Sequence, residues 1–518
     1  MTRAVRAARR LGAHVPPPLL VRLSALWHGE TALQRRLHGR SAPGSPLGRD
    51  QPLSGVARLD AALFAALDAL QAGGVPCAVL EAGTMRRRVV VVTGDHGDAA
   101  RRALAATSAV VQPVGSAVLR LHHGDPAFGC DVEIWPLVGS GPRPDGGAYV
   151  PGTALAPRAN RWVRYLEPGE RVAARGQVGG QDVPTYSGLL KPHLLDVDFP
   201  IDVVYTWVDG ADPAWQRRKE QAWVALHPEH HHPSAVTSSR FASHDELRYS
   251  LRSLETYADW VRTVYVVTDG QRPAWLRTDH PRLRVVDHRE LFAGTQALPT
   301  FNSHAIEARL HHVAGLSEHF LYLNDDVFFG RPVRPELFFE ASGLARFFLT
   351  DALIDLAGPS ARDLPVASAA KQTRAVVERL HSRTVTQRFQ HVAHPQRRST
   401  LEQIEAQLPD ELEATVRSRF RSPSDLSVPS SLAHYVGYAS GRAVPGTLSY
   451  LYCDVTERRA PIKLQRLARR RDADVFCLNE TDTPGGHPGH RLMVDFLESY
   501  FPRPSSFETG ADALRRPR

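Results

Sequence analysis

Three apolar runs that each stop at an acidic turn constrain the fold of this chain most strongly. The runs VVYTWV, VRTVYVV and FLYL lead into Asp209-Gly210, Asp269-Gly270 and Asn324-Asp325-Asp326. Short apolar runs bounded by turn residues are typical of buried strands. Helical patterns at 244–257 and 302–313 separate the runs. Because strands alternate with helices, we expect an α/β core with a mostly parallel sheet.

The acidic turns should share one edge of that sheet. In an open α/β sheet, ligands bind at the carboxyl ends of the strands. The adjacent carboxylates of Asp325 and Asp326 are suitable ligands for a hard divalent cation, Mg²⁺ or Mn²⁺, which would hold the phosphates of a nucleotide substrate. We therefore expect the candidate site at this edge.

The sequence pattern divides the chain into five parts. They are a basic tail and linker (1–54), a small N-terminal α/β unit (55–195), the first part of the catalytic core (196–345), a helical part (346–450) and a return to short strands that completes the core (451–518). In the N-terminal unit, the pairs Asp95/Asp98 and Asp131/Glu133 either form a second acidic site or are ordinary turn formers at strand ends.

Composition limits the function classes and the compartment. The hydrophobic share of 42% and the charged share of 23% are typical of a globular protein. A net charge of +8 suits phosphate-rich ligands or an anionic membrane surface, and we expect no nucleic-acid partner. The four cysteines have no CxxC spacing, which argues against a zinc ribbon or a disulfide framework. A reducing, cytoplasmic setting is the simplest expectation.

The N-terminal segment has two interpretations. Residues 1–40 contain eight arginines and one acidic residue, and no apolar stretch in the chain reaches the roughly 18 residues that suggest a transmembrane helix. The apolar side of Leu19–Trp27 is suited to lie on the inner face of the plasma membrane as a peripheral contact. The alternative is a solvated basic tail.

Several long motifs of the sequence resemble the conserved regions of the Stealth family. They are IDVVYTWVDG, SRF followed by DELRYSLRSLE, VTDGQ, FNSHAIE and FLYLNDDVFFG, which together cover about 200–345. The likeness continues through HVAHPQRRS (391–399), RFRSPSDLS (419–427) and VFCLNE (475–480). The family includes bacterial capsular polysaccharide phosphotransferases and the catalytic part of the animal GlcNAc-1-phosphotransferase.

The resemblance implies an activity and a fold. The implied reaction moves a hexose-1-phosphate, such as GlcNAc-1-phosphate, from a UDP-sugar donor to a glycan hydroxyl, forming a phosphodiester and releasing UMP. The implied fold is a Rossmann-like, glycosyltransferase-A-like core. Two other functions remain open: a metal-dependent glycosyltransferase that releases UDP, and a non-catalytic nucleotide-sugar-binding protein.

The resemblance also implies roles for particular residues. Asp325 and Asp326 would handle the metal and the donor phosphates. His391, with His394 as the alternative, would be the general base, since a histidine can accept a proton near neutral pH. Arg421 would hold the donor diphosphate, to which its planar guanidinium is well matched. The further donor or substrate contacts that we expect are Asp209, Trp207 (unless it is a core residue), Arg248, Asn302, His304, Asn324, Arg374 and Asn479.

Overall fold

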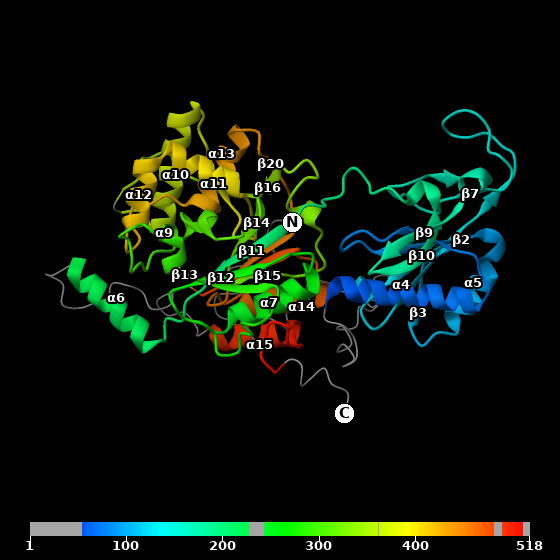
Figure 1. The fold of residues 1–518 in the computed structure, drawn as a ribbon, viewed down its shortest axis with the longest axis horizontal. Coiled ribbons are helices and arrows are strands. Elements are labelled where there is room, and N and C mark those ends of the chain that lie inside the picture. Colours follow the sequence, from blue (N-terminus) through cyan, green and yellow to red (C-terminus); the bar gives the residue numbers. More distant parts are fainter. Residues whose placement is uncertain (1–53, 227–242, 361, 481–488, 511–518) are drawn as a thin grey trace, which may run out of the picture.

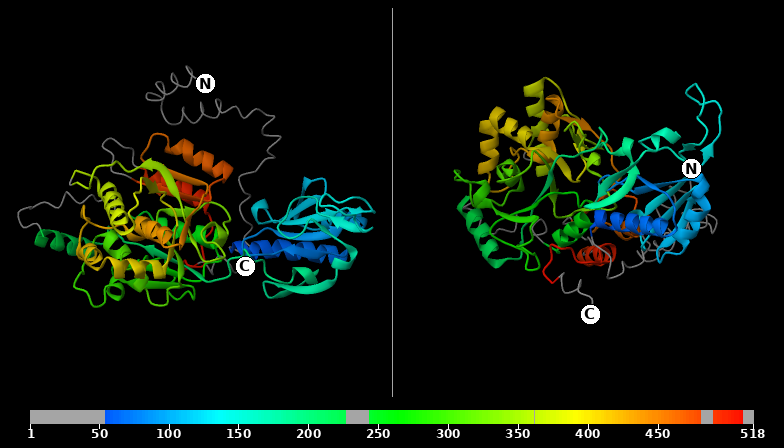
Figure 2. Two further views of the ribbon diagram at one scale, coloured as in Figure 1. Left: turned by 90° about the horizontal axis from the view of Figure 1, so that it is seen from above. Right: turned by 45° about the vertical axis from the view of Figure 1, so that its right-hand side comes forward.

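The computed structural model describes residues 54–226, 243–360, 362–480 and 489–510. A smaller N-terminal part and a larger core lie side by side along the long axis of the molecule (Figure 1). The same arrangement is visible from above (Figure 2). The basic segment 1–53, to which the expected membrane contact belongs, lies outside the described residues.

The N-terminal part is an α/β unit, as its sequence pattern predicts. Its main sheet has the strand order β1-β2-β5-β4-β3, with β2 and β5 parallel. Helices α4 and α5 bury Leu63, Leu67 and Leu104 against this sheet. The bounds are α4 (Gly55–Ala72), β1 (Ala78–Glu81), β2 (Arg88–Thr93), α5 (Gly97–Ala105), β3 (Val110–Gly115), β4 (Val118–His122), β5 (Cys130–Trp135), β6 (Leu137–Val138), β7 (Thr153–Leu155), β8 (Tyr165–Leu166), β9 (Ala173–Val178) and β10 (Gln181–Tyr186).

Arginines form hydrogen bonds with Asp131 and Glu133 of this unit. Asp131 accepts hydrogen bonds from Arg120 Nε at 2.7 Å and from Arg158 Nη2 at 2.8 Å. Glu133 accepts from Arg158 Nε at 2.7 Å and from Trp135 Nε1 at 2.9 Å. Because both carboxylates are buried and accept hydrogen bonds from neighbouring side chains, the structural interpretation of this pair is favoured over a second acidic site.

The N-terminal unit packs on the core beside helix α7 (Glu246–Tyr257). The rings of Phe128 and Tyr257 stack with their centroids 6.0 Å apart, and the guanidinium of Arg58 lies 3.7 Å from the centroid of Phe128. An ion pair of 2.7 Å joins Arg86 to Glu336 of the core. The contact therefore combines an aromatic centre with charged edges.

The central sheet of the core has the strand order β13-β12-β11-β14-β19. Strands β13, β12, β11 and β14 are parallel, and β19 is antiparallel to β14. The three apolar runs of the sequence form β11, β12 and β14, which are buried on both faces and for this reason lack a polar alternation. The bounds are β11 (Ile201–Thr206), β12 (Val264–Thr268), β13 (Leu283–Asp287), β14 (His319–Asn324) and β19 (His394–Arg397).

Alternate residues of these strands pack into two different hydrophobic cores. Val203 and Leu321 pack with Leu251 of α7 on one face of the sheet. Val204 and Phe320 pack on the other face, against the helical part of the chain. Since successive strand side chains point to opposite faces, one strand supplies both cores. The sheet is thus the middle layer of the core.

A second, smaller sheet with the strand order β15-β22-β21 completes the core. Strand β15 (Val327–Phe329) follows the turn after β14 and pairs antiparallel with β22 (Val475–Asn479), which is parallel to β21 (Tyr450–Asp454). The C-terminal part of the chain therefore returns to the acidic edge of the central sheet. The helices α14 (Ala460–Arg470) and α15 (His490–Tyr500) accompany these strands.

The remaining elements form the helical part and short connections. The helix predicted over 302–313 is two elements, α9 (Ser303–Glu307) and the 3₁₀ turn η7 (Leu310–His312), because the chain leaves helical dihedrals at Arg309. The other bounds are α6 (Pro213–Leu226), α8 (His288–Leu291), β16 (Ala345–Phe347), β17 (Leu349–Leu353), α10 (Pro365–His381), β18 (Gln387–Phe389), α11 (Arg398–Gln407), α12 (Pro409–Arg417), the π-helical turn η9 (Val428–Leu432), α13 (Ala433–Ala439) and β20 (Ala443–Pro445).

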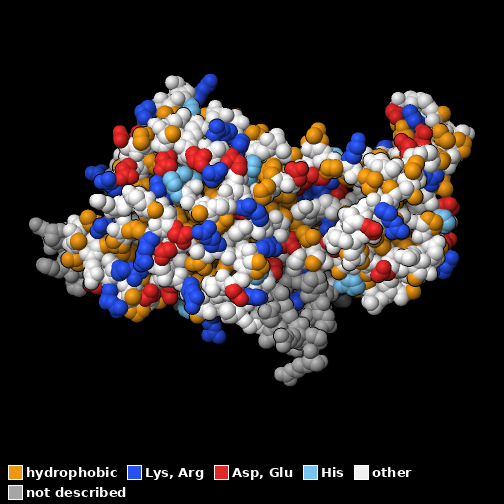
Figure 3. Space-filling view, viewed as in Figure 1, with side chains coloured by type: hydrophobic (Ala, Val, Ile, Leu, Met, Phe, Trp, Pro, Cys, Tyr) orange, Lys and Arg blue, Asp and Glu red, His pale blue; other side chains and the backbone are white. Residues whose placement is uncertain are grey.

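The surface carries both signs of charge. On the face shown in Figure 3, basic and acidic side chains are interspersed over the core and over the N-terminal unit. Among the described helices, none has the length and apolar character that crossing a membrane requires.

Candidate active site at the carboxyl end of the central sheet

The acidic turns of β11 and β14 meet at one edge of the central sheet. Thr206, at the end of β11, is paired in register with both Asn324 of β14 and Val267 of β12. Asp325 and Asp326 follow directly, in the turn that connects β14 to β15. The parallel register therefore produces the common edge that the sequence predicts.

The antiparallel strand β19 brings His391 to this edge. Tyr322 of β14 lies opposite His394 of β19, so the residues that precede β19 pass beside the turn that follows β14. His391 Nε2 lies 3.1 Å from Asn324 Nδ2 and 4.0 Å from Asp326 Oδ1. The expected base and the expected acidic pair, which are distant in sequence, are thus neighbours in the structure.

Strand β22 adds Cys477, a residue that sequence reasoning missed. Val327 of β15 is opposite Cys477 of β22, which places the thiol beside Asp326. Its Sγ lies 3.4 Å from Asp326 Oδ2 and 3.5 Å from His391 Nδ1. The spacing of the four cysteines gave no signal for this role, since the contact depends on strand pairing alone.

The hydrogen bonds among these side chains follow one direction. The amide of Asn324 donates to His391 Nε2, so we assign the imidazole proton to Nδ1, which faces the sulfur of Cys477. The thiol donates in turn to the carboxylate of Asp326. Burial, with the charge and hydrogen bond of Asp326, raises the pKa of Cys477 well above its usual range, which keeps the thiol protonated as a donor.

A third carboxylate, Glu246, adds negative charge to the site from the N-terminus of α7. Burial, followed by the charges of Glu246 and Asp326, raises the pKa of Asp325 well above its usual range. Burial and the nearby Asp326 also raise the pKa of Glu246, which accepts a hydrogen bond of 2.6 Å from the His244 amide. Like charges crowded in this way disfavour full ionisation unless a cation balances them.

The residues present fit a divalent cation. Asp326 Oδ1 is buried and has no hydrogen-bond partner among the described residues, although buried carboxylate oxygens are normally satisfied. Asp326, His391 and Cys477 place one candidate ligand atom each within 4.8 Å of one another. Because the thiol is protonated, the carboxylates are the donors that suit a hard cation such as Mg²⁺ or Mn²⁺.

Arg421 lies near the same edge on a segment that Asn302 fixes. The exposed guanidinium of Arg421 donates to Ser303 Oγ at 2.7 Å. The amide of the fully buried Asn302 donates to the backbone oxygen of Ser418 at 3.0 Å and to Asp425 Oδ2 at 2.8 Å. Asn302 also caps α9 by accepting from the His304 amide. Asn302 thus supports the segment that carries Arg421.

His304 and His394, the other two histidines expected at the site, are buried and contact buried side chains. His304 is 4% exposed, and its Nδ1 lies 3.6 Å from the buried Asp425. His394 Nδ1 lies 3.1 Å from His434 Nε2. Burial, followed by the neighbouring His434 and His391, lowers the pKa of His394 well below its usual range. A neutral, buried ring at His394 favours His391 as the base of the pair.

The expected donor contacts at the ends of β11 and β22 already interact with neighbouring residues. Trp207 is 8% exposed and belongs to the main hydrophobic core, so its ring has little surface left for a uracil. Asp209 caps its own turn by accepting from the Ala211 amide at 2.9 Å. Asn479 donates to the Tyr452 hydroxyl at 2.7 Å. Asp209 and Asn479 remain partly exposed at the edge of the site.

Two arginines expected near phosphates make internal contacts. Arg248 Nε lies 2.5 Å from Glu508 Oε2, and the buried Arg252 forms two hydrogen bonds of 2.8 Å with the same carboxylate. The guanidinium of Arg374, which is 6% exposed, donates to the backbone oxygens of Asp355 and Ala357 at 2.6 and 2.7 Å. The structure therefore does not gather Arg248 or Arg374 with the Asp326–His391 group.

Comparison with known proteins identifies the family. The four conserved regions of Stealth proteins match residues 199–222, 240–347, 390–438 and 465–518. An exopolysaccharide phosphotransferase of Streptomyces coelicolor, SCO6023, is 45% identical over 417 residues, which cover 78% of this chain and 67% of the relative. The chain belongs to the Stealth family.

Other relatives extend the likeness over more of their length. CpsY of Mycobacterium tuberculosis, also named an exopolysaccharide phosphotransferase, is 35% identical over 80% of this chain and 77% of its own. A Nocardia farcinica protein of the same name is 35% identical over 83% of this chain and 84% of its own. Among solved structures, the galactosyltransferase LgtC matches 58% of this chain and 96% of its own, at 12% identity and a TM-score of 0.30.

Proposed function

We propose that this Stealth protein is a sugar-phosphate transferase, which moves a hexose-1-phosphate from a UDP-sugar to a hydroxyl of a cell-surface polysaccharide. The observation that carries the proposal is the 4.0 Å separation of His391 Nε2 from Asp326 Oδ1, which places a proton acceptor beside an acidic group that fits a cation. The names of the relatives support the same reaction class. GlcNAc-1-phosphate is the group that we expect to be transferred.

His391 is the proposed general base for the acceptor hydroxyl. The hydroxyl oxygen forms a bond to the β-phosphorus of the donor, the bond between this phosphorus and the bridging oxygen breaks, and UMP leaves. The hydroxyl proton passes to His391 Nε2, once the acceptor hydroxyl has replaced the Asn324 amide as the donor to its lone pair. Asn324 and Cys477 fix the orientation of the ring, since each lies within hydrogen-bond reach of one ring nitrogen.

Asp325 and Asp326 are the proposed ligands of a divalent cation, Mg²⁺ or Mn²⁺. When bound, the cation supplies neutralisation of the charge on the donor phosphates. Arg421 is the proposed contact of the donor diphosphate, because its exposed guanidinium can form paired hydrogen bonds with phosphate oxygens. Asp209 and Asn479 are proposed to border the donor at the carboxyl ends of β11 and β22.

The released nucleotide tests the proposal. A sugar-phosphate transferase releases UMP, whereas a metal-dependent glycosyltransferase releases UDP and a binding protein releases neither. We expect UMP from one member of a panel of UDP-sugars in the presence of a glycan acceptor. Chelation should abolish its release, and added Mg²⁺ or Mn²⁺ should restore it. Asp326→Asn should be inactive but folded by circular dichroism. Release of UDP would overturn the proposed sugar-phosphate transfer. Full activity in excess chelator would overturn the proposed divalent cation.

We also propose that the basic segment 1–40, which lies outside the described residues, contacts the anionic inner face of the plasma membrane from the cytoplasm. Each basic residue near such a surface contributes about 1 kcal/mol. The full-length protein should sediment with vesicles that contain phosphatidylserine at low salt, and removal of residues 1–40 should abolish this without loss of catalysis. A full-length protein that stays in the supernatant would refute the contact.

A further inference from the structure

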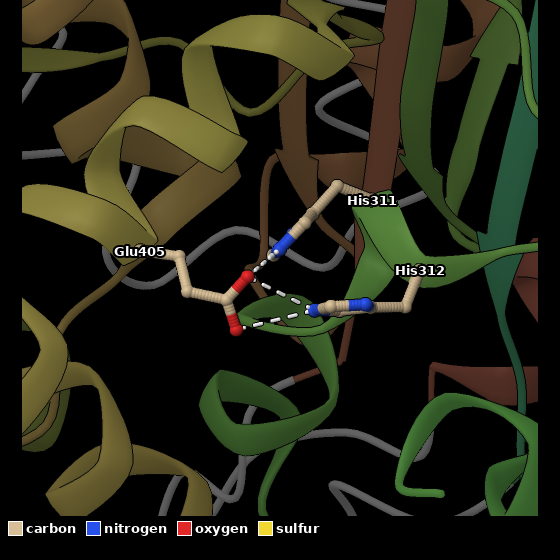
Figure 4. A group of neighbouring side chains, drawn as sticks. All are labelled: His311, His312 and Glu405. Carbon is tan, nitrogen blue, oxygen red and sulfur yellow. Dashed lines mark hydrogen bonds and ion pairs between the residues drawn. The ribbon is translucent and has the colours of Figure 1, made fainter.

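A second cluster of metal-ligating side chains lies where the helical part of the chain packs on the core. His311 and His312 belong to the turn η7, and Glu405 belongs to helix α11. In Figure 4 both imidazoles point toward the carboxylate from the same short turn. His311 Nε2 lies 2.7 Å from Glu405 Oε2, and His312 Nε2 lies 3.1 Å from the same oxygen.

The spacing of these three atoms suits coordination of one ion. Their ligand atoms all lie within 4.8 Å of one another. Two ligands at about 2.1 Å from a tetrahedral ion are separated by about 3.4 Å. The observed separations of 2.7 and 3.1 Å are slightly shorter, as expected for hydrogen bonds that an ion would replace. Admission of the ion therefore requires His311 and Glu405 to move slightly apart, as well as a small movement of the partly exposed His312.

The protonation states also suit a metal. Burial lowers the pKa of His311 to about 4, so this imidazole is neutral at physiological pH. The pKa of Glu405 is lowered: burial raises it, but the hydrogen bonds from His311 and His312 contribute in the opposite direction. A neutral imidazole and an ionised carboxylate are the forms that bind a metal ion.

Arg309 orients the carboxylate without occupying the shared oxygen. Its Nη1 donates to Glu405 Oε1 at 2.8 Å, and its Nε donates to the backbone oxygen of Leu291 at 3.1 Å. Oε2 therefore remains directed toward the two imidazoles. A hydrogen-bonded partner of this kind on a ligating group is common around protein metal sites.

We propose that His311, His312 and Glu405 form a three-ligand zinc site that clamps α11 to η7. Two imidazoles and one carboxylate are ligands that Zn²⁺ accepts, and the 35% exposure of the His312 side chain leaves a fourth position for water. The clamp lies beside the core formed by Leu310, Leu401 and Ile404. Its role would be to stabilise the helical part, which carries Arg421, independently of the cation at Asp325 and Asp326.

Zinc titration of the full-length protein tests the site. The metal-stripped protein in saturating Mg²⁺ is titrated with ZnCl₂, by calorimetry and by thermal unfolding. We expect the wild-type chain to bind one equivalent more than Glu405→Gln or His312→Gln, and to gain a higher Tm from zinc than either variant. Glu402→Gln, an exposed position on the same helix, is the matched control and should behave as wild type.

The comparison between proteins removes the contribution of other zinc-binding groups. The histidines of segment 227–238 and the active-site thiol are present in every variant, so they contribute equally to each titration. His312 is partly exposed, so its variant should fold even if Glu405→Gln does not. Equal zinc stoichiometry in the wild type and both variants would overturn the proposal and leave an ordinary hydrogen-bonded cluster. Loss in one variant alone would overturn the three-ligand site.

Discussion

The Sγ of Cys477 lies 3.4 Å from Asp326 Oδ2, although the two residues are 151 positions apart in the chain. The same sulfur lies 3.5 Å from His391 Nδ1. One thiol thus connects the acidic turn after β14 to the proposed base. Its position depends on the register of β15 and β22, so the geometry of the site depends on the C-terminal return of the chain.

Removal of this thiol should reduce turnover. We expect Cys477→Ala to lower kcat about 10–100-fold, the loss that is common when a supporting hydrogen bond at a metal site is removed. Cys477→Ser, which can still donate to Asp326, should retain more activity. Cys453→Ser on the neighbouring strand β21 is the control, since its thiol faces the backbone oxygen of Asp454. The measurement is the rate of UMP release, and equal rates for Cys477→Ala and wild type would exclude the role.

Loss of the base should be rescued by a small imidazole. His391→Ala should lower kcat by about 10²–10⁴-fold while the KM for the donor stays nearly unchanged, because the base acts on the acceptor. Added imidazole should restore part of the rate by occupying the vacated space beside Asn324. If His391→Ala keeps near-normal turnover and His394→Ala does not, the two roles are exchanged. If neither matters, a carboxylate at the edge of the sheet is the base.

Substitution of Arg421, or of Asn302 which supports its segment, should weaken binding of the donor. Arg421→Ala should raise the KM for the donor and lower kcat, whereas Arg417→Ala, an exposed arginine of the preceding helix, should change neither. Asn302→Ala should raise the KM in the same direction, because the backbone oxygen of Ser418 loses this donor and Asp425 keeps only the hydrogen bond from the Ser422 amide. Buried groups left unpaired cost about 1–3 kcal/mol each, so the Tm should fall as well. An unchanged donor KM in Arg421→Ala would contradict the assignment.

Acid should destabilise the fold through His434. Burial lowers the pKa of His434 to about 3, while a histidine in the unfolded chain titrates near pH ~6.5. Between these values the unfolded chain binds the additional proton. The stability is therefore fully present above about pH 6.5 and falls, by up to about 1.4 kcal/mol per pH unit, as the pH drops toward the folded value.

Urea unfolding at several pH values between 4.5 and 7 measures this dependence. His434→Gln, which can still hydrogen-bond to His394, should show a shallower slope than the wild type. His96→Gln, at a side chain that is 40% exposed, should leave the slope unchanged. Equal slopes for the His434 variant and the wild type would show that another group governs the acid response.

The sequence predicts the parallel part of the core well. The runs at 201–207, 262–267, 283–287 and 319–323 are strands within a residue or two, since continuous apolar stretches have few alternatives to a buried sheet. The edge shared by Asp209, Asp325 and Asp326 follows from this topology. The family resemblance supplied His391, and the structure places it beside that edge.

Residues whose roles depend on distant pairing could not be predicted. Cys477 gains its position from a strand register that no local pattern encodes. Arg252 has the spacing of a solvated helix face, yet it is buried because the segment around Glu508 covers it. The strand β19 is short and polar, and it is buried only because it closes the edge of the central sheet beside β14.

The pairing of Arg252 with Glu508 has a consequence for synthesis of the chain. Until residue 508 has left the ribosome, Arg252 of helix α7, the helix that carries Glu246 into the site, lacks both the segment that covers it and the carboxylate that pairs with it. A buried charge without its partner is strongly unfavourable. The catalytic edge can therefore reach its final arrangement only after residue 508 has emerged. Products of premature termination before residue 508 would be recognisable to proteases by this unfinished helix.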